Sequence, residues 1–264
     1  MSKLFRSSVR ENRKLTTDHY LITLRPLKKI RKPKPGQFFM LSVDSGLDPL
    51  LKRPFSLHRW LGGDFQLLYE TVGKATNILK YKAPGNVLEM IGPLGNGFPA
   101  GPSKTGILLV AGGLGIAPVF ALAESVSSRR PLLFLGAKSR KEVLCIEKLR
   151  SLGIRPTVTT DDGSLGKKGL ITDILIDFLS RQSSTCLPVG KVVNRYRVYA
   201  CGPKPMLREM SRITKKFRLK GYLALEENMA CGVGACLSCV VNTTDGLKRV
   251  CKEGPVFPAE EIIW

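Results

Sequence analysis

Four of the seven cysteines of this 264-residue chain lie within one stretch of twenty-one residues, and this cluster constrains the fold more than any other feature. Cys231, Cys236 and Cys239 follow the spacing C-x4-C-x2-C, and Cys251 follows after eleven intervening residues. Plant-type [2Fe-2S] proteins show this spacing, and their four thiolates hold the cluster. The sequence therefore predicts an iron-sulfur cluster held by Cys231, Cys236, Cys239 and Cys251.

The residues around these cysteines suit a loop that wraps a cluster. Gly232 and Gly234 allow positive φ angles, so that backbone amides can turn toward the sulfur atoms. TTDG, Thr243 to Gly246, predicts a turn that brings the fourth thiolate back on a hairpin. A structural zinc site is the alternative, but most four-cysteine zinc sites pair two C-x2-C units, and this segment has one.

Sequence patterns divide the chain into three parts, residues 1-102, 103-219 and 220-264. The first part has short β-rich segments separated by Gly and Pro, which predicts an antiparallel β-barrel. These segments are HYLITL, QFFMLSV, FSLHRW, DFQLLYETV and NVLEMIG. In the second part, strand-like segments such as GILLVAGG and PLLFLGA alternate with helical ones such as VFALAESVSS, which predicts an α/β domain with a parallel sheet. The third part is too short and glycine-rich for a large core.

We expect the protein to lie in the cytoplasm. The segment MSKLFRSSVRENRK lacks the apolar region and cleavage site of a secretory signal. In a reducing compartment, clustered cysteines bind a metal more often than they form disulfides. The uncharged segment Gly106 to Ala123 has the length of a membrane span, but three glycines and Pro118 interrupt it. A strand, a glycine turn and a helix fit it better, so no membrane span is predicted.

The net charge of +21, from 42 Lys plus Arg and 21 Asp plus Glu, requires an explanation. Basic residues concentrate in Arg25 to Pro35, which has the composition of a solvated loop, and in Ser211 to Lys220, which suits the exposed end of a helix. Neither segment interleaves aromatic residues with its charges, as single-strand nucleic-acid grooves do. Nucleic-acid binding is therefore disfavoured, and acidic ligands or a generally basic proteome are the alternatives.

The barrel segment contains candidates for flavin binding. In the RPFS segment, an arginine fork and a serine hydroxyl can hold a phosphate, although a surface arginine before a strand explains the segment equally simply. The segment LLYETVGKAT adds strand residues, a glycine turn and a second hydroxyl. The flavin candidates are Arg53, Pro54, Phe55, Ser56, Leu68, Tyr69, Glu70, Ala75 and Thr76. GPLGNGF, residues 92–98, follows at the expected domain junction.

Two motifs in the α/β part predict a dinucleotide site. GGLGIAP follows a strand and precedes a helix, whose first amides can face a pyrophosphate, although Pro118 replaces the third glycine of G-x-G-x-x-G. CGPKPM follows another strand and is expected at the carboxyl edge of the same sheet, with a buried structural cysteine as the alternative. The candidates are Gly112, Gly113, Gly115, Cys201, Gly202 and Pro203.

In their order along the chain, RPFS, GPLGNGF, GGLGIAP, CGPKPM and the cysteine segment resemble the ferredoxin reductase superfamily. The segments EENMACGVGACLSC, RVCKEGPVF and AEEIIW resemble the electron-transfer subunits of bacterial dihydroorotate dehydrogenase B. The resemblance covers essentially the whole chain. It implies an FAD-binding barrel, an NAD-binding α/β domain and a small C-terminal [2Fe-2S] domain. It also implies a partner, the catalytic FMN-containing dihydroorotate dehydrogenase subunit of pyrimidine synthesis, in a heterotetramer of two of each chain.

In such a complex, electrons pass from the partner's FMN through the cluster to FAD and then, as a hydride, to NAD. The cofactors carry this chemistry, and neither His19 nor His58 has a catalytic constellation, so no catalytic residue is assigned. This chain departs from the family at Glu70, where a basic residue is common, and at Ala75 and Thr76, where Gly-Thr is common. We expect Glu70 to point away from the pyrophosphate. TDDGSLG, residues 160–166, favours NAD over NADP.

Two other functions remain open. The chain resembles related flavin and iron-sulfur NAD(P)H reductase subunits that serve another partner, such as a sulfide dehydrogenase or a hydrogenase. A cluster-bearing nucleic-acid-binding or sensing protein would instead use the charge of +21. A flavin absorbance band separates this last class from the other two.

Overall fold

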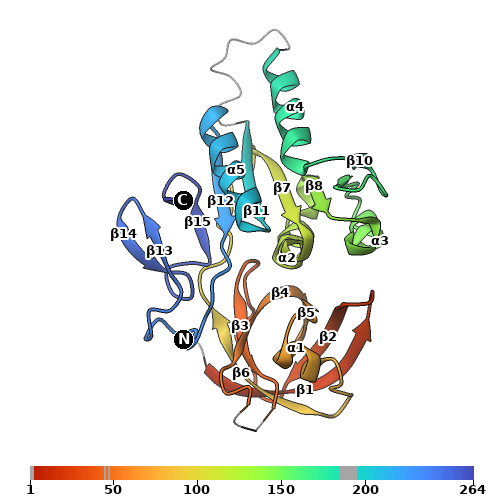
Figure 1. Ribbon diagram of the computed structural model, residues 1–264, viewed down its shortest axis with the longest axis vertical. Coiled ribbons are helices and arrows are strands. Elements are labelled where there is room, and N and C mark those ends of the chain that lie inside the picture. Colours follow the sequence, from red (N-terminus) through yellow and green to blue (C-terminus); the bar gives the residue numbers. More distant parts are fainter. Residues whose placement is uncertain (1–2, 45, 47, 185–194) are drawn as a thin grey trace.

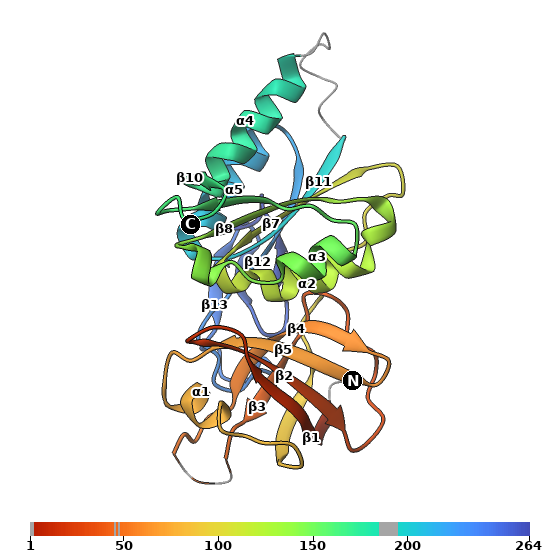
Figure 2. The ribbon, with the colours of Figure 1, turned by 90° about the vertical axis from the view of Figure 1, so that its right-hand side faces the viewer.

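The computed structural model describes residues 3–44, 46, 48–184 and 195–264, and Cys186 lies outside these residues. A β-barrel occupies one end of the molecule and a second, larger sheet the other, as Figures 1 and 2 show. The C-terminal cysteine segment lies beside both of them (Figure 1). The predicted fold class, an antiparallel barrel followed by an α/β region and a cysteine-rich end, is confirmed.

Six antiparallel strands close the barrel in the order β1-β2-β5-β4-β3-β6. Its elements are β1 (Lys3–Lys14), β2 (His19–Pro26), β3 (Phe38–Ser42), β4 (Arg53–Leu61), β5 (Asp64–Glu70), α1 (Lys74–Leu79) and β6 (Val87–Leu94). Alternate residues of each strand point inward, and aromatic rings such as Phe39 and Phe65, with centroids 4.5 Å apart, fill the interior. The five predicted barrel segments correspond to β2 through β6.

Strand β1 was not among the predicted segments. Phe5, Ser7 and Val9 are buried, whereas the alternate positions Leu4, Arg6 and Arg10 are exposed. Buried and exposed residues therefore alternate along β1 as in other strands. The alternation is hard to see in the sequence, because one buried position is a serine and many of the residues are charged. A bulge between Val9 and Glu11 interrupts the register as well.

The second sheet has seven strands in the order β10-β9-β8-β7-β11-β12-β15, and all neighbours are parallel except β12 and β15. Its strands are β7 (Gly106–Gly112), β8 (Leu132–Ala137), β9 (Thr157–Thr160), β10 (Lys167–Lys168), β11 (Tyr196–Cys201), β12 (Lys220–Ala224) and β15 (Val256–Pro258). Its helices are α2 (Ile116–Ser125), α3 (Ile146–Ser151), α4 (Ile171–Ser184) and α5 (Lys204–Lys216), with short 3-10 turns η1 (Gly113–Gly115), η2 (Ser127–Arg129) and η3 (Arg140–Glu142).

Helices cover both faces of this sheet (Figure 2). Along β7, Leu108 packs in one core with α4 and α5, while the next residue, Leu109, packs in the other core with α2 and α3. This two-sided burial produces the continuous apolar run of the sequence. Gly106 to Ala123 folds as the predicted strand, glycine turn and helix. None of the described helices is long and apolar enough to cross a membrane.

The C-terminal segment shares its core with the sheet. Strands β12 and β15, both within residues 220–264, form one edge of the seven-stranded sheet, and Cys239 and Cys251 belong to the same hydrophobic core as Leu223. The remaining strands of the segment, β13 (Val240–Thr243) and β14 (Gly246–Arg249), pair as a hairpin. The boundary at residue 219 and the one at 102 remain predictions.

Direct contacts fix the barrel against the α/β region. Arg59 on β4 forms an ion pair of 2.6 Å with Glu124 on α2. His58, also on β4, lies with its Nδ1 3.3 Å from the carbonyl of Ala117. The Tyr199 hydroxyl donates to the carbonyl of Pro99 in the linker, at 2.9 Å. These contacts set the distance between any groups that the two regions bind.

Candidate functional site

The cysteine segment folds as a loop followed by a hairpin. Cys231 and Cys236 lie in the loop, Cys239 directly precedes β13, and Cys251 follows β14. The TTDG turn joins the two strands as predicted, with Thr243 opposite Gly246. The loop rests on the barrel, because a Cβ atom at Gly232 (φ +70°) would lie 2.3 Å from Cγ of Met40 on β3.

The four thiols lie as two pairs. The backbone amide of Cys236 donates to Sγ of Cys231, and the backbone amide of Cys251 donates to Sγ of Cys239. In a [2Fe-2S] cluster each of the two irons takes two protein ligands, so two thiol pairs match what the cluster needs. Within the part of the chain that the structure describes, no three His, Cys, Asp or Glu side chains are arranged around a single metal ion.

Backbone amides surround the sulfur atoms. The Cys231 Sγ accepts hydrogen bonds from the amides of Val233 at 3.4 Å, Ala235 at 3.3 Å and Cys236 at 3.5 Å. The amide of Cys251 donates to Cys239 Sγ at 3.4 Å. Such N–H···S contacts stabilise thiolates and are common around iron-sulfur clusters. The loop therefore fits the predicted cluster in its backbone as well as in its cysteines.

The two pairs differ in their surroundings. Cys236 is exposed, and hydrogen bonds from Ser238 lower the pKa of its thiol to about 6. Cys251 is buried, and this burial raises the pKa of its thiol to about 12. A metal ligand must be a thiolate, so the buried thiol gives up its proton when it binds iron. Cys236 therefore marks the side of the loop that faces solvent.

A pocket of about 580 Å³ lies where the barrel, the α/β region and the cysteine segment meet. Seven of the nine predicted flavin residues line it, namely Pro54, Phe55, Ser56, Leu68, Tyr69, Glu70 and Thr76. They come from β4, β5 and α1, which are adjacent in the barrel. Its volume and its apolar and aromatic walls are typical of a cofactor site.

The other two predicted flavin residues are placed differently. Nη1 of Arg53 donates to the carbonyl of Leu51 at 2.6 Å, so its guanidinium supports the loop before β4. Ala75 is buried in the barrel core. Thr76 lines the pocket, and its hydroxyl accepts from the amides of Val72 and Gly73 and so caps α1. The direction expected for the Glu70 side chain remains a prediction.

Several pocket residues were not predicted from the sequence. They are Phe38, Val72, Leu114, Ala117, Leu225, Glu226, Glu227, Asn228, Met229 and Pro255. Residues 225–229 form the connection from β12 to the first cysteine, so one wall of the pocket leads directly into the cluster loop. Since a residue spans at most about 3.6 Å of chain, the Cα atoms of Met229 and Cys231 are within roughly 7 Å of each other.

The two predicted dinucleotide motifs lie side by side. Cys201, the last residue of β11, is paired with Ala111 of β7, so both strands end at the same edge of the sheet. A Cβ atom at Gly115 would lie only 2.2 Å from the carbonyl oxygen of Cys201. The absence of a side chain there lets η1 sit directly on CGPKPM. Leu114, between the motif glycines, lines the 580 Å³ pocket. The site predicted for NAD therefore adjoins the pocket predicted for FAD.

At this junction a thiol and a carboxyl group meet. Cys201 is buried, and its Sγ lies 3.8 Å from Oε1 of Glu226. Glu226 lines the pocket and is exposed as a residue, but the protein atoms around its carboxyl group partly desolvate it and raise the pKa of that group. Burial and the neighbouring Glu226 raise the pKa of the Cys201 thiol well above its ordinary value. Both shifts favour the uncharged forms of these two groups.

Comparison with known proteins agrees with this geometry. Residues 226–263 match the model of the iron-sulfur cluster binding domain of dihydroorotate dehydrogenase B, and residues 109–212 match an oxidoreductase NAD-binding domain. The chain is also similar to a solved structure described as an NADH-dependent reduced ferredoxin-NADP oxidoreductase, in work on flavin-based electron bifurcation. That match has a TM-score of 0.81 and 26% identity and covers 98% of this chain and 90% of the other.

Relatives match the chain over nearly its full length. The dihydroorotate dehydrogenase B (NAD(+)) electron transfer subunit of Caldanaerobacter subterraneus subsp. tengcongensis is 38% identical, with 98% of both chains covered. The protein of the same name from Geobacillus kaustophilus is also 38% identical, again with 98% of both chains covered. The thiol pairs, the pocket and these matches lead to one conclusion: the chain belongs to the family of electron transfer subunits of dihydroorotate dehydrogenase B.

Proposed function

We propose that this chain carries electrons between a dihydroorotate-oxidising subunit and NAD, using a [2Fe-2S] cluster and FAD. A cluster exchanges single electrons, a flavin exchanges one or two, and NAD exchanges a hydride, so the flavin connects the two kinds of transfer. The chain's own residues bind these groups, orient them and exclude water. The role of each residue below is part of this proposal.

Cys231, Cys236, Cys239 and Cys251 hold the cluster, and the backbone amides of the loop stabilise their thiolates. The residues of the 580 Å³ pocket hold the FAD, with Ser56 and Tyr69 among its polar contacts. Gly112, Gly113 and Gly115, with Cys201, Gly202 and Pro203, hold the NAD. Because Arg53 is engaged with Leu51, it must change its partner if it is to contact the flavin phosphate.

One observation carries the proposal: a single pocket touches both other sites. Met229 lines the pocket two residues before Cys231, and Leu114 lines it from within the motif assigned to NAD. A flavin in this pocket would lie beside both groups with which it must exchange electrons. The buried contacts between barrel and α/β region, such as His58 against α2, hold this arrangement.

The partner in this proposal is a catalytic FMN-containing dihydroorotate dehydrogenase subunit, in a heterotetramer of two of each chain. The exposed Cys236 and its neighbours Val233 (46% exposed) and Leu237 (60% exposed) offer a surface through which the cluster can be approached. We place this complex in the cytoplasm, where pyrimidine precursors are made. NAD is the preferred nucleotide because Asp161 and Asp162 follow β9 at the carboxyl edge of the sheet.

The test uses the complete chain loaded with its cofactors and a separately produced FMN-containing dihydroorotate dehydrogenase subunit. We expect dihydroorotate to drive the formation of NADH only when both chains are present. Cys236→Ser should lower the iron content and abolish this coupled reaction. The same variant should still use NADH to reduce ferricyanide, which requires the flavin and nicotinamide sites but not the cluster.

Cys145→Ser serves as the matched control, because Cys145 is a free thiol outside the cysteine segment, with its Sγ 4.0 Å from Nε2 of His58, and it does not line the pocket. It should keep its iron and its coupling. Cys236→Ser with unchanged iron and unchanged coupling would refute the assignment of the cluster. An intact ferricyanide reaction without any coupling to dihydroorotate would instead indicate a different partner, such as a sulfide dehydrogenase or a hydrogenase.

A further inference from the structure

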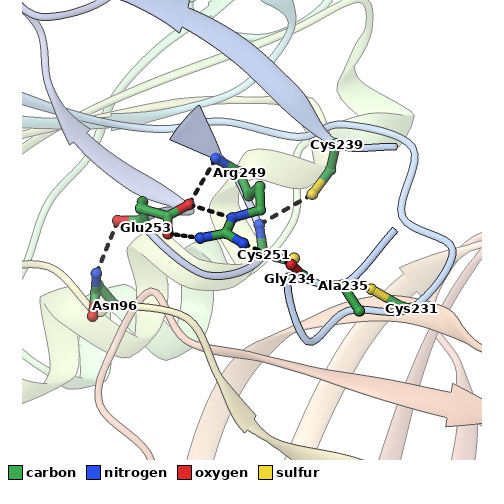
Figure 3. A network of polar contacts seen from close by, with 8 residues as sticks. All are labelled: Asn96, Cys231, Gly234, Ala235, Cys239, Arg249, Cys251 and Glu253. Atoms are coloured by element: carbon green, nitrogen blue, oxygen red, sulfur yellow. Dashed lines mark hydrogen bonds and ion pairs between the residues drawn. The ribbon is translucent and has the colours of Figure 1, made fainter. Parts of the chain in front are cut away.

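A network of charged groups ties the cysteine loop to the turn that carries Cys251 (Figure 3). Arg249 ends β14, and Glu253 lies four residues later, across the turn. The carboxylate of Glu253 accepts from the backbone amide of Arg249 at 2.8 Å, from its Nε at 3.0 Å and from its Nη2 at 2.5 Å. The two side chains are 28% and 32% exposed, so this bidentate pair is partly shielded from water.

The remaining arm of the guanidinium reaches the loop itself. Nη1 of Arg249 donates to the carbonyl of Gly234 at 2.7 Å. The same peptide unit carries the amide of Ala235, which donates to Cys231 Sγ at 3.3 Å. One peptide thus accepts from a cation at one end and donates to a cluster ligand at the other, and Figure 3 shows these residues in line.

We propose that Arg249 is a positioning residue that raises the reduction potential of the cluster through the Gly234–Ala235 peptide, and that Glu253 limits this effect. The inference deepens the proposed function, and it requires that the cluster is bound to the four cysteines. It assigns a role to side chains that are neither ligands nor residues of the flavin pocket.

The effect of Arg249 on the reduction potential follows from the charge that the cluster gains on reduction. A reduced cluster carries one more negative charge than an oxidised one, so hydrogen-bond donors and positive charges near its sulfur ligands favour reduction. A cation at the carbonyl polarises the peptide and makes its amide a stronger donor, because hydrogen bonds in series strengthen one another. The carboxylate of Glu253 opposes the charge of Arg249, and it also holds the guanidinium in place.

The barrel holds the other end of this network. Nδ2 of Asn96, in the GPLGNGF segment, donates to the carbonyl of Glu253 at 2.8 Å, and the Asn96 amide donates to the carbonyl of Gly254 at 2.6 Å. The next residue, Pro255, lines the flavin pocket. The group that polarises the loop is therefore fixed to the wall of the flavin site, which keeps its distance from the cluster constant.

The experiment is a redox titration of the cluster-loaded chain, followed by its electron paramagnetic resonance signal. Arg249→Gln should lower the midpoint potential, so that the ratio of reduced to oxidised cluster at a fixed potential falls about tenfold, or ~59 mV for one electron. Glu253→Gln should raise the potential, because the guanidinium keeps its place but loses the opposing charge. Arg249→Lys should lie between the wild type and Arg249→Gln.

Lys248→Gln is the matched control, because Lys248 precedes Arg249 on β14 and its ion pairs are with Asp245 and Glu261. It also removes one positive charge, but not one that contacts the loop, so its shift should be clearly smaller. Equal shifts in Arg249→Gln and Lys248→Gln, or shifts of the same sign in Arg249→Gln and Glu253→Gln, would overturn the inference.

Iron content separates the possible failures. If Arg249→Gln loses its iron, the inference is tested by the midpoint potential of the cluster in Glu253→Gln. A potential above that of the wild type supports the inference, and an unchanged potential overturns it. A wild-type chain that binds no cluster after reconstitution would instead refute the proposed function. If the wild-type chain binds its cluster but the Arg249 and Glu253 variants do not shift its potential in opposite directions, the inference is refuted and the proposed function is not.

Discussion

His58 makes the stability of this protein depend on pH. Its side chain is 1% exposed and packs against Phe120, with ring centroids 4.7 Å apart. Because the Ala117 carbonyl can only accept, Nδ1 carries the proton of the neutral ring, and Nε2 is left facing Cys145 Sγ at 4.0 Å. Burial, with a further contribution from the charge of Lys148, lowers the pKa of His58 to about 3.

The sign and size of the effect follow from linkage. The unfolded chain binds a proton at His58 near pH 6.5, whereas the folded chain does not bind it until about pH 3. Stability from this residue is therefore complete above the unfolded pKa and is lost as the pH falls below it. Between about pH 7.5 and about pH 5 the expected loss is roughly 2 kcal/mol.

Urea unfolding of the complete chain, followed by tryptophan fluorescence, measures this loss. His58→Gln keeps an amide donor for the Ala117 carbonyl but cannot take up a proton, so its stability should fall by roughly 2 kcal/mol less than that of the wild type over the same pH range. Phe120→Leu, which alters the same packing without removing a titrating group, should keep the wild-type difference. An equal loss of stability in His58→Gln and in the wild type would refute this reasoning.

Two further predictions concern contacts that the α/β region makes within itself and with the barrel. Gly115→Ala places a methyl group 2.2 Å from the Cys201 carbonyl oxygen, so the motifs GGLGIAP and CGPKPM must move apart. We expect a loss of roughly 1–3 kcal/mol in the free energy of unfolding and a higher KM for NADH in ferricyanide reduction. An unchanged KM would contradict the role assigned to these motifs. Arg59→Gln removes the partly exposed ion pair with Glu124 and should lower the free energy of unfolding by about 1 kcal/mol or less. The difference between variant and wild type should shrink at high salt. A larger loss in urea unfolding that does not depend on salt would contradict a simple ion pair.

Features that depend on neighbouring residues could be predicted from the sequence. The cysteine spacing and the TTDG turn predict the loop and the hairpin, and the structure forms both. The glycine turn of GGLGIAP between β7 and α2 is equally local. In each case the required conformation is encoded within a few residues, by glycines, turn residues or spacing.

Features that depend on contacts between distant parts of the chain could not be predicted from the sequence. Glu226 to Met229 line the pocket because β12, which pairs with β11 and β15, ends beside it, and nothing in their own sequence indicates a cofactor. Ala75 stands next to a pocket residue in sequence but is turned into the barrel core, since adjacent residues of a helix face different directions. The contact of Arg249 with Gly234, fifteen residues away, likewise exists only once the hairpin has formed.

The central claim is that the four C-terminal cysteines hold an iron-sulfur cluster beside a flavin pocket, and the metal content of the reconstituted chain tests it most directly. We expect two irons, two acid-labile sulfides and one FAD per chain, with the iron and sulfide lost together in Cys236→Ser while the FAD remains. A chain that instead binds one zinc ion, with no labile sulfide, would contradict the claim.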